Sequence, residues 1–187
     1  MMPVILTSIN QGNNTQAHRF SGNQHQSRRA KPSPREITDL IVRWLDTLQS
    51  PTQPWKLFVT VTMRRYDPFT GTAWNLTEID KAICTFTRRL DQKVFRHEAR
   101  RSFRTIARIV ARHLGDYEDN PHYHIVVACP RFLDESNLEK YLIDIAKRIE
   151  WINGKPHIER YFSSGAIGYL LSDNASELVL EATEAAK

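Results

Sequence analysis

The stretch KLFVTVTMR, residues 56–64, alternates between two kinds of side chain along its whole length. One set is apolar and consists of Leu57, Val59, Val61 and Met63, and the other consists of Phe58, Thr60 and Thr62. Successive side chains of a β-strand point to opposite faces, so the pattern predicts a strand with one face in a hydrophobic core. The fold therefore includes a sheet that is covered on at least one side.

Helical patterns precede and follow this strand. Before it, Ser33 and Pro34 can start a helix whose apolar face is Ile37, Ile41, Trp44, Leu45 and Leu48. After it, Thr77 is predicted to cap a longer helix whose apolar face is Ile79, Ile83, Phe86, Leu90 and Val94. Both stripes recur at helical spacing, which indicates that each helix packs on the sheet.

The second half of the chain also contains both strand and helix patterns. Strands are predicted at residues 106–113 and 122–129, and Ser136 with Glu139 forms a capping box for the next helix. Asn153-Gly154 is typical of a tight hairpin, and Gly165 opens a last helix over residues 166–171. The acidic segment after it is predicted to be helical.

This order of elements predicts an α+β fold with a mostly antiparallel sheet of the split βαβ kind, which is the ferredoxin-like or RRM-like class. Residues 1–32 are rich in Asn, Gln, Ser, Arg and His and are expected to form a flexible basic arm. Residues 33–173 form the predicted domain, and residues 174–187 an acidic tail.

The bulk composition favours a polyanionic partner. The chain has 26 lysines and arginines against 21 acidic residues, a formal net charge of +5. Cys84 and Cys129 have no metal-ligand spacing and are expected to be reduced, and no apolar run approaches the about 20 residues that span a bilayer. We therefore expect a cytoplasmic protein without a membrane partner.

The densest chemical signal is the run NPHYHIVV, residues 120–127. Two residues apart on a strand share a face, so His122 and His124 project together as a pair of metal ligands. His113, at the end of the preceding strand, is the first choice for a third ligand, with Glu118 or Asp116 of the connecting loop as alternatives. Two ordinary histidines at a sheet rim are the competing interpretation.

A run of basic residues leads into this region. The candidates for contact with DNA phosphates are Arg96, Arg100, Arg101, Arg104, Arg108 and Arg112. A solvated helix face is the alternative explanation for such a run. Trp55, Trp74 and Phe69 lie in or beside loops, where they can either stack on unpaired bases or pack against the sheet edge.

Taken together, the strand FVTVT (58–62), the segment PHYH (121–124) and the segment GAIGYLL (165–171) resemble the three motifs of the HUH endonuclease superfamily. That superfamily includes rolling-circle replication initiators, plasmid relaxases and single-strand transposases. The resemblance covers roughly residues 55–173 and implies that His122 and His124 hold Mg²⁺ or Mn²⁺ while Tyr169 attacks the scissile phosphate. Tyr161, eight positions earlier, is the rival nucleophile.

The resemblance implies nicking and joining of single-stranded or hairpin DNA, in rolling-circle replication or mobile-element processing. A free tyrosine has a pKa of about 10 and is a weak nucleophile at neutral pH, so a cation that polarises the phosphate suits this chemistry. A replication role also implies a host helicase as partner.

One feature departs from the family pattern. Many members carry a lysine three or four residues after the tyrosine, where this chain has Ser172 and Asp173. The alternative function is therefore an inactive HUH-fold protein that binds DNA without cutting it. A structural metal site in a domain unrelated to nucleic acid is a third reading, which the arginine run argues against.

Overall fold

The computed structural model describes residues 34–96, 98, 104–114, 121–161, 163, 165–172 and 176–186. Over these residues the chain forms one five-stranded sheet in the order β4-β1-β3-β2-β5, with every neighbouring pair antiparallel. The strands are β1 (Trp55–Thr62), β2 (Arg108–His113), β3 (His122–Ala128), β4 (His157–Arg160) and β5 (Ser176–Leu178). The described helices are α1 (Pro34–Asp46), α2 (Leu76–Phe95), α4 (Glu135–Ala146) and α5 (Gly165–Ser172).

The α+β prediction is confirmed, because helices and an antiparallel sheet build this part of the chain together. Strand β3 lies between β1 and β2, the two strands on either side of α2 in the sequence. The finer assignment to a split βαβ topology is compatible with this order and stays a prediction. The boundary between the predicted basic arm and the domain lies outside the described residues.

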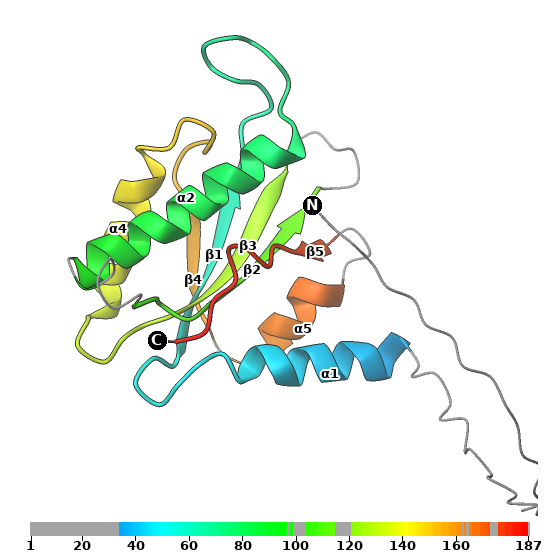
Figure 1. Ribbon diagram of the computed structural model, residues 1–187, viewed down its shortest axis with the longest axis vertical. Coiled ribbons are helices and arrows are strands. Elements are labelled where there is room, and N and C mark those ends of the chain that lie inside the picture. Colours follow the sequence, from blue (N-terminus) through cyan, green and yellow to red (C-terminus); the bar gives the residue numbers. More distant parts are fainter. Residues whose placement is uncertain are drawn as a thin grey trace, which may run out of the picture. The chain divides into compact units, whose positions relative to one another are not determined.

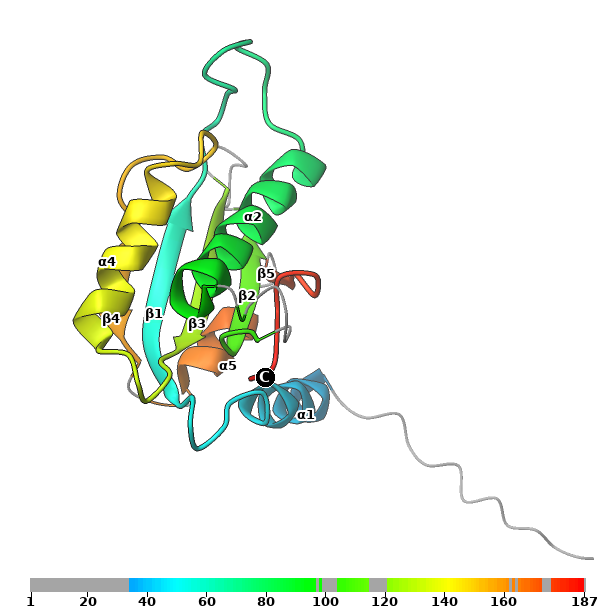
Figure 2. The same cartoon turned by 60° about the vertical axis from the view of Figure 1, so that its left-hand side comes forward.

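One face of the sheet carries the main core. The alternating side chains Leu57, Val59 and Val61 of β1 are fully buried, as the sequence pattern predicted. They lie on the face that α2 and α4 cover, and their core partners from these helices are Ile79, Ile83, Phe86, Leu90, Leu138 and Leu142. Figures 1 and 2 show these two helices together on one side of the sheet.

The second face is covered only in part. Helix α5 buries Ile167 and Leu170 and contacts α1 and β5. Along β3 the exposure of the side chains alternates from His122 to Ile125 and then gives way to continuous burial up to Ala128. The cover of this face therefore ends near His124, and the part of the sheet beyond it is accessible.

Two predicted helix starts are wrong. The N-cap of α2 is Asn75, whose side chain accepts a hydrogen bond of 3.0 Å from the backbone N–H of Glu78, so Thr77 lies inside the helix. Helix α4 has Asp134 at its N-cap, and the hydroxyl of Ser136 donates to the Asp134 carboxylate. In each case the N-cap position is taken by a residue two positions earlier, and only the Asn75 side chain makes a capping hydrogen bond.

The predicted hairpin at Asn153-Gly154 is also wrong. Ile152 bridges to Met63, and β4 pairs with residues 57–60 of β1, so the chain runs along one strand on both sides of this dipeptide. Gly154 adopts φ +74°, a left-handed conformation that glycine enters without strain, in the irregular segment between Ile152 and β4. The chain does not reverse there. The acidic tail is not helical at residues 176–178, which form β5 on the edge of β2.

Candidate functional site

Three histidines meet on the partly covered face of the sheet. His113 pairs directly with His122 across β2 and β3, and His124 follows two residues later on the same face. The ring centroids of His113 and His122 are 4.5 Å apart, those of His122 and His124 4.8 Å, and those of His113 and His124 6.2 Å. The prediction that these residues lie together is confirmed, and we call them the histidine cluster.

Hydrogen bonds orient the rings of the histidine cluster. Nδ1 of His113 lies 2.9 Å from Nε2 of His122, with the proton carried by one or the other according to the tautomer. Nδ1 of His124 lies 3.1 Å from the hydroxyl of Thr60, its neighbour across β1 and β3. His113 and His122 are thus joined to each other, while His124 is held by Thr60 of the neighbouring strand β1.

Tyr169 lies next to the histidine cluster. Its ring centroid is 5.9 Å from that of His124 and 6.4 Å from that of Phe58, which itself lies 5.4 Å from His124. The side chain is 62% exposed, although its helix neighbour Leu170 is fully buried. Helix α5 is therefore anchored by one side and presents the phenol beside the imidazoles on the other.

The rival nucleophile Tyr161 is not part of this arrangement. Its backbone N–H donates to the carbonyl of Lys56, and Lys56 precedes Thr60 on β1 by four residues, about 13 Å along a strand. The ring packs partly into the core. Burial, together with the charge of nearby Asp46, raises the pKa of Tyr161 to about 12.

The imidazoles supply nitrogen donors of the kind that transition metals prefer. In the described part of the chain, however, no group of three or more His, Cys, Asp or Glu side chains is arranged so that it could hold a metal ion as it stands. The hydrogen bond between His113 and His122 occupies two of the candidate donor atoms. The alternative ligands Glu118 and Asp116 lie outside the described residues.

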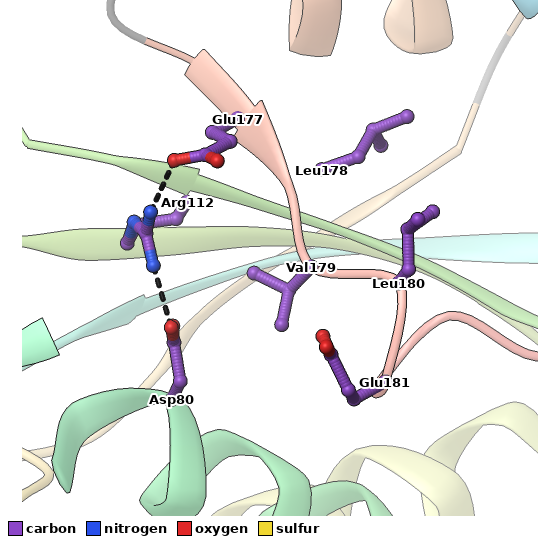
Figure 3. Close-up of a pocket in the computed structure, with 7 residues that line it drawn as sticks. All are labelled: Asp80, Arg112, Glu177, Leu178, Val179, Leu180 and Glu181. Carbon is purple, nitrogen blue, oxygen red and sulfur yellow. Dashed lines mark hydrogen bonds and ion pairs between the residues drawn. The ribbon is translucent and has the colours of Figure 1, made fainter. Parts of the chain in front are cut away.

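A polar network lies directly behind the histidines. Tyr123, between His122 and His124 in sequence, is fully buried on the opposite face, and its hydroxyl donates a 2.6 Å hydrogen bond to Oδ1 of Asp80 on α2. Arg112 donates to Oδ2 of the same carboxylate at 2.6 Å and also pairs with Glu177 (Figure 3). Burial, and then the hydrogen bond to Asp80, raise the pKa of Tyr123 far above its ordinary value.

The predicted DNA-binding arginines divide into two groups. Arg108 is buried against both carboxylate oxygens of Asp91, at 2.8 and 2.9 Å, and Arg112 is only 8% exposed in the network described above. Both point toward the helix-covered face, away from the histidine cluster, so their expected place on the DNA-facing surface is wrong. Arg96 and Arg104 are exposed, and Arg104 pairs with Glu98 at 2.6 Å; Arg100 and Arg101 lie outside the described residues.

Sequence reasoning missed Asp80 and the role of Thr60. Thr60 had a usable signal, because it shares a strand face with Phe58 and Thr62. Asp80 had no usable signal, because a single acid on an amphipathic helix is normally solvated. Its partners Tyr123 and Arg112 are known only once β2 and β3 are seen to pack beside α2.

Comparisons with known proteins add no family to this geometry: no family model, no curated protein and no solved structure matches the chain. Among the described residues, no helix is long and apolar enough to cross a membrane. The site's own geometry therefore carries the functional argument.

Proposed function

We propose that this chain is an HUH-type endonuclease that nicks and rejoins single-stranded DNA through a covalent bond to Tyr169. The observation that carries the proposal is the position of the Tyr169 ring, exposed and 5.9 Å from the ring of His124. Residues 45 positions apart in the chain meet there on an accessible part of the sheet. The resemblance to the family predicted this meeting from two separate motifs.

The histidine cluster would hold the divalent ion after a rearrangement of its rings. Neighbouring ligands of an octahedral ion with bonds of about 2.0–2.1 Å lie about 2.9 Å apart. Nδ1 of His113 and Nε2 of His122 are 2.9 Å apart, so their spacing matches two neighbouring ligands, but both rings would have to turn from their hydrogen bond for their lone pairs to meet on one ion. His124 is the third candidate ligand, and Mg²⁺ or Mn²⁺ held there would neutralise charge on the scissile phosphate.

The remaining chemistry belongs to the chain's own side chains. The phenol oxygen of Tyr169 forms a bond to phosphorus and gives up its proton, while the bond from phosphorus to the 3′ oxygen breaks and that oxygen takes up a proton. A 5′-phosphotyrosine keeps the phosphodiester as an ester, so a 3′-hydroxyl can reverse the step and rejoin the strand. Phe58 lies beside the rings of both His124 and Tyr169, with centroids 5.4 and 6.4 Å away.

An inactive HUH-fold protein that binds DNA without cutting it is the second candidate. It is favoured by Ser172 and Asp173, which stand where many family members have a lysine. Without that lysine side chain, less positive charge is available to stabilise a tyrosinate or the phosphate. Both candidates place DNA on the same face of the sheet.

An adduct experiment distinguishes them. The full chain is incubated with labelled single-stranded oligonucleotides and Mn²⁺, and denaturing gels are scanned for label that migrates with the protein. Nicking predicts an adduct that is lost in Tyr169→Phe and retained in the matched variant Tyr161→Phe. Binding without any adduct over a broad set of sequences supports the inactive protein, and an adduct that survives Tyr169→Phe excludes Tyr169 as the nucleophile.

A further inference from the structure

The connection between β1 and α2 is an ordered hairpin. The N–H of Asp67 donates to the carbonyl of Thr72 at 2.8 Å, the N–H of Trp74 donates to the carbonyl of Arg65 at 3.1 Å, and Tyr66 bridges to Ala73. Figures 1 and 2 show this connection standing away from the sheet beyond the end of β1. We call residues 64–74 the β1–α2 hairpin.

The tip of the hairpin is held by one carboxylate. Oδ1 of Asp67 accepts hydrogen bonds of 2.8 Å from the N–H groups of both Phe69 and Thr70, and these bonds lower the pKa of Asp67. Gly71 adopts φ +67°, a left-handed conformation that glycine enters without strain. The turn is therefore organised by its own backbone, and the position of Phe69 follows from it.

This ordered turn presents aromatic rings to solvent. Phe69 is 77% exposed and Tyr66 is 48% exposed, and the guanidinium of Arg65 lies 5.5 Å from the centre of the Tyr66 ring. Arg64 and Arg65 are both exposed, whereas the single acid of the hairpin, Asp67, is engaged with backbone amides. Exposed aromatic rings beside arginines are the combination that binds unpaired bases and their phosphates.

The hairpin also starts at the level of the histidine cluster. Thr62 pairs directly with His122, and Tyr66 is only four residues further along, about 14 Å at most for an extended chain. Tyr66 therefore lies at the base of the hairpin and Phe69 further out at its tip, where a strand of DNA that extends from the cluster past the end of β1 would meet them. Two isolated rings flanked by arginines offer too little apolar surface for a stable protein interface, which leaves DNA as the better fit.

We propose that the β1–α2 hairpin is a base-stacking site for single-stranded DNA, in which Phe69 and Tyr66 stack on unpaired bases next to the scissile phosphate. This inference rests on the proposed function for the position of the phosphate. The stacking itself needs neither metal nor cleavage, so the two proposals can fail separately.

The test measures binding of a fluorescein-labelled oligonucleotide of mixed sequence to the full chain in EDTA. Phe69→Ala is expected to weaken binding about 5- to 150-fold, the range for loss of one stacked base, whereas Phe69→Trp retains it. The matched control is Phe132→Ala, because Phe132 is 66% exposed and follows the other end of β3. Binding of a duplex of the same sequence should change little in either variant.

Equal binding by wild type and Phe69→Ala overturns the proposal, as does an equal loss for Phe132→Ala or for duplex DNA. Tighter binding of the matching RNA oligonucleotide overturns the assignment to DNA. A selective loss in Phe69→Ala supports the stacking site even when wild-type protein forms no adduct with Mn²⁺. That last outcome removes the nicking proposal and leaves a single-strand binder.

Discussion

The hydroxyl of Tyr123 donates a 2.6 Å hydrogen bond to Asp80 on the face of β3 opposite His122 and His124. Helix α2 thereby holds the strand that carries the two histidines. Tyr123→Phe removes a buried hydrogen bond to a charged group, so we expect the free energy of unfolding to fall by about 1.5–3 kcal/mol. Urea denaturation measures the change, with the exposed Tyr66→Phe as a control that should stay within about 0.5 kcal/mol of wild type.

Arg112 is expected to be a structural residue. Arg112→Met removes the cation from the Asp80 carboxylate, whose side chain is 30% exposed, so we expect the free energy of unfolding to fall by about 1.5–3 kcal/mol, the range for a hydrogen bond to a charged group. Arg104 pairs with Glu98 at the surface, so Arg104→Met should cost less than about 1 kcal/mol. Chemical denaturation of both variants checks the difference.

The Arg112→Met variant also tests the predicted contact of Arg112 with DNA. For a folded Arg112→Met protein, the slope of log affinity for single-stranded DNA against log salt should equal that of wild type, because a buried arginine releases no counterion from DNA. A slope smaller by about 0.7, the value for one lost phosphate contact on a single strand, would show that Arg112 does reach the backbone.

Local sequence patterns predicted much of the candidate site. The period of two in residues 120–127 places His122 and His124 on one face without knowledge of any partner, and His113 follows because it ends the neighbouring strand. The exposure of Tyr169 required more, since Ile167, Leu170 and Leu171 allow either face of a short helix to be buried. The resemblance to known motifs selected Tyr169, and the structure has its ring beside those of Phe58 and His124.

The features that could not be predicted from the sequence depend on contacts between residues far apart in the chain. The sequence of a strand looks the same whether its arginine is exposed to solvent or paired with a carboxylate. The two partners of Arg112 lie 32 and 65 positions away in the chain. Strand β5 has three residues, too few for a pattern, and forms because the edge of β2 is available to it. The same holds for residues 152–160, whose course is set by the exposed edge of β1 and overrides the local turn signal of Asn153-Gly154.

Alkaline pH is expected to destabilise the fold through Cys129. Burial raises the pKa of the Cys129 thiol to about 11 from an ordinary value near 9. Between these values the folded state holds the proton more tightly than the unfolded state, so the free energy of unfolding falls as pH rises from about 9 to about 11. Below pH 9 the thiol contributes no slope.

Urea denaturation at pH 8, 9, 10 and 11 follows this loss, and Cys129→Ala should reduce the slope without abolishing it. Tyr123 continues to act in the same direction above pH 10, since its pKa is raised as well. An unchanged slope in Cys129→Ala would mean that the thiol is not the group responsible.

Metal binding gives the sharpest test of the histidine cluster. His122→Ala removes the ring that lies closest to both other imidazoles, so we expect binding of Mn²⁺, measured by calorimetry without DNA, to weaken at least tenfold. His157→Ala is the matched control, because His157 is an exposed histidine on β4 that pairs with Glu159 and lies across β1 from the cluster. Its affinity for Mn²⁺ should equal that of wild type. An equal loss in both variants would point to nonspecific binding, and unchanged binding in His122→Ala would mean that the histidine cluster is not the site that holds Mn²⁺.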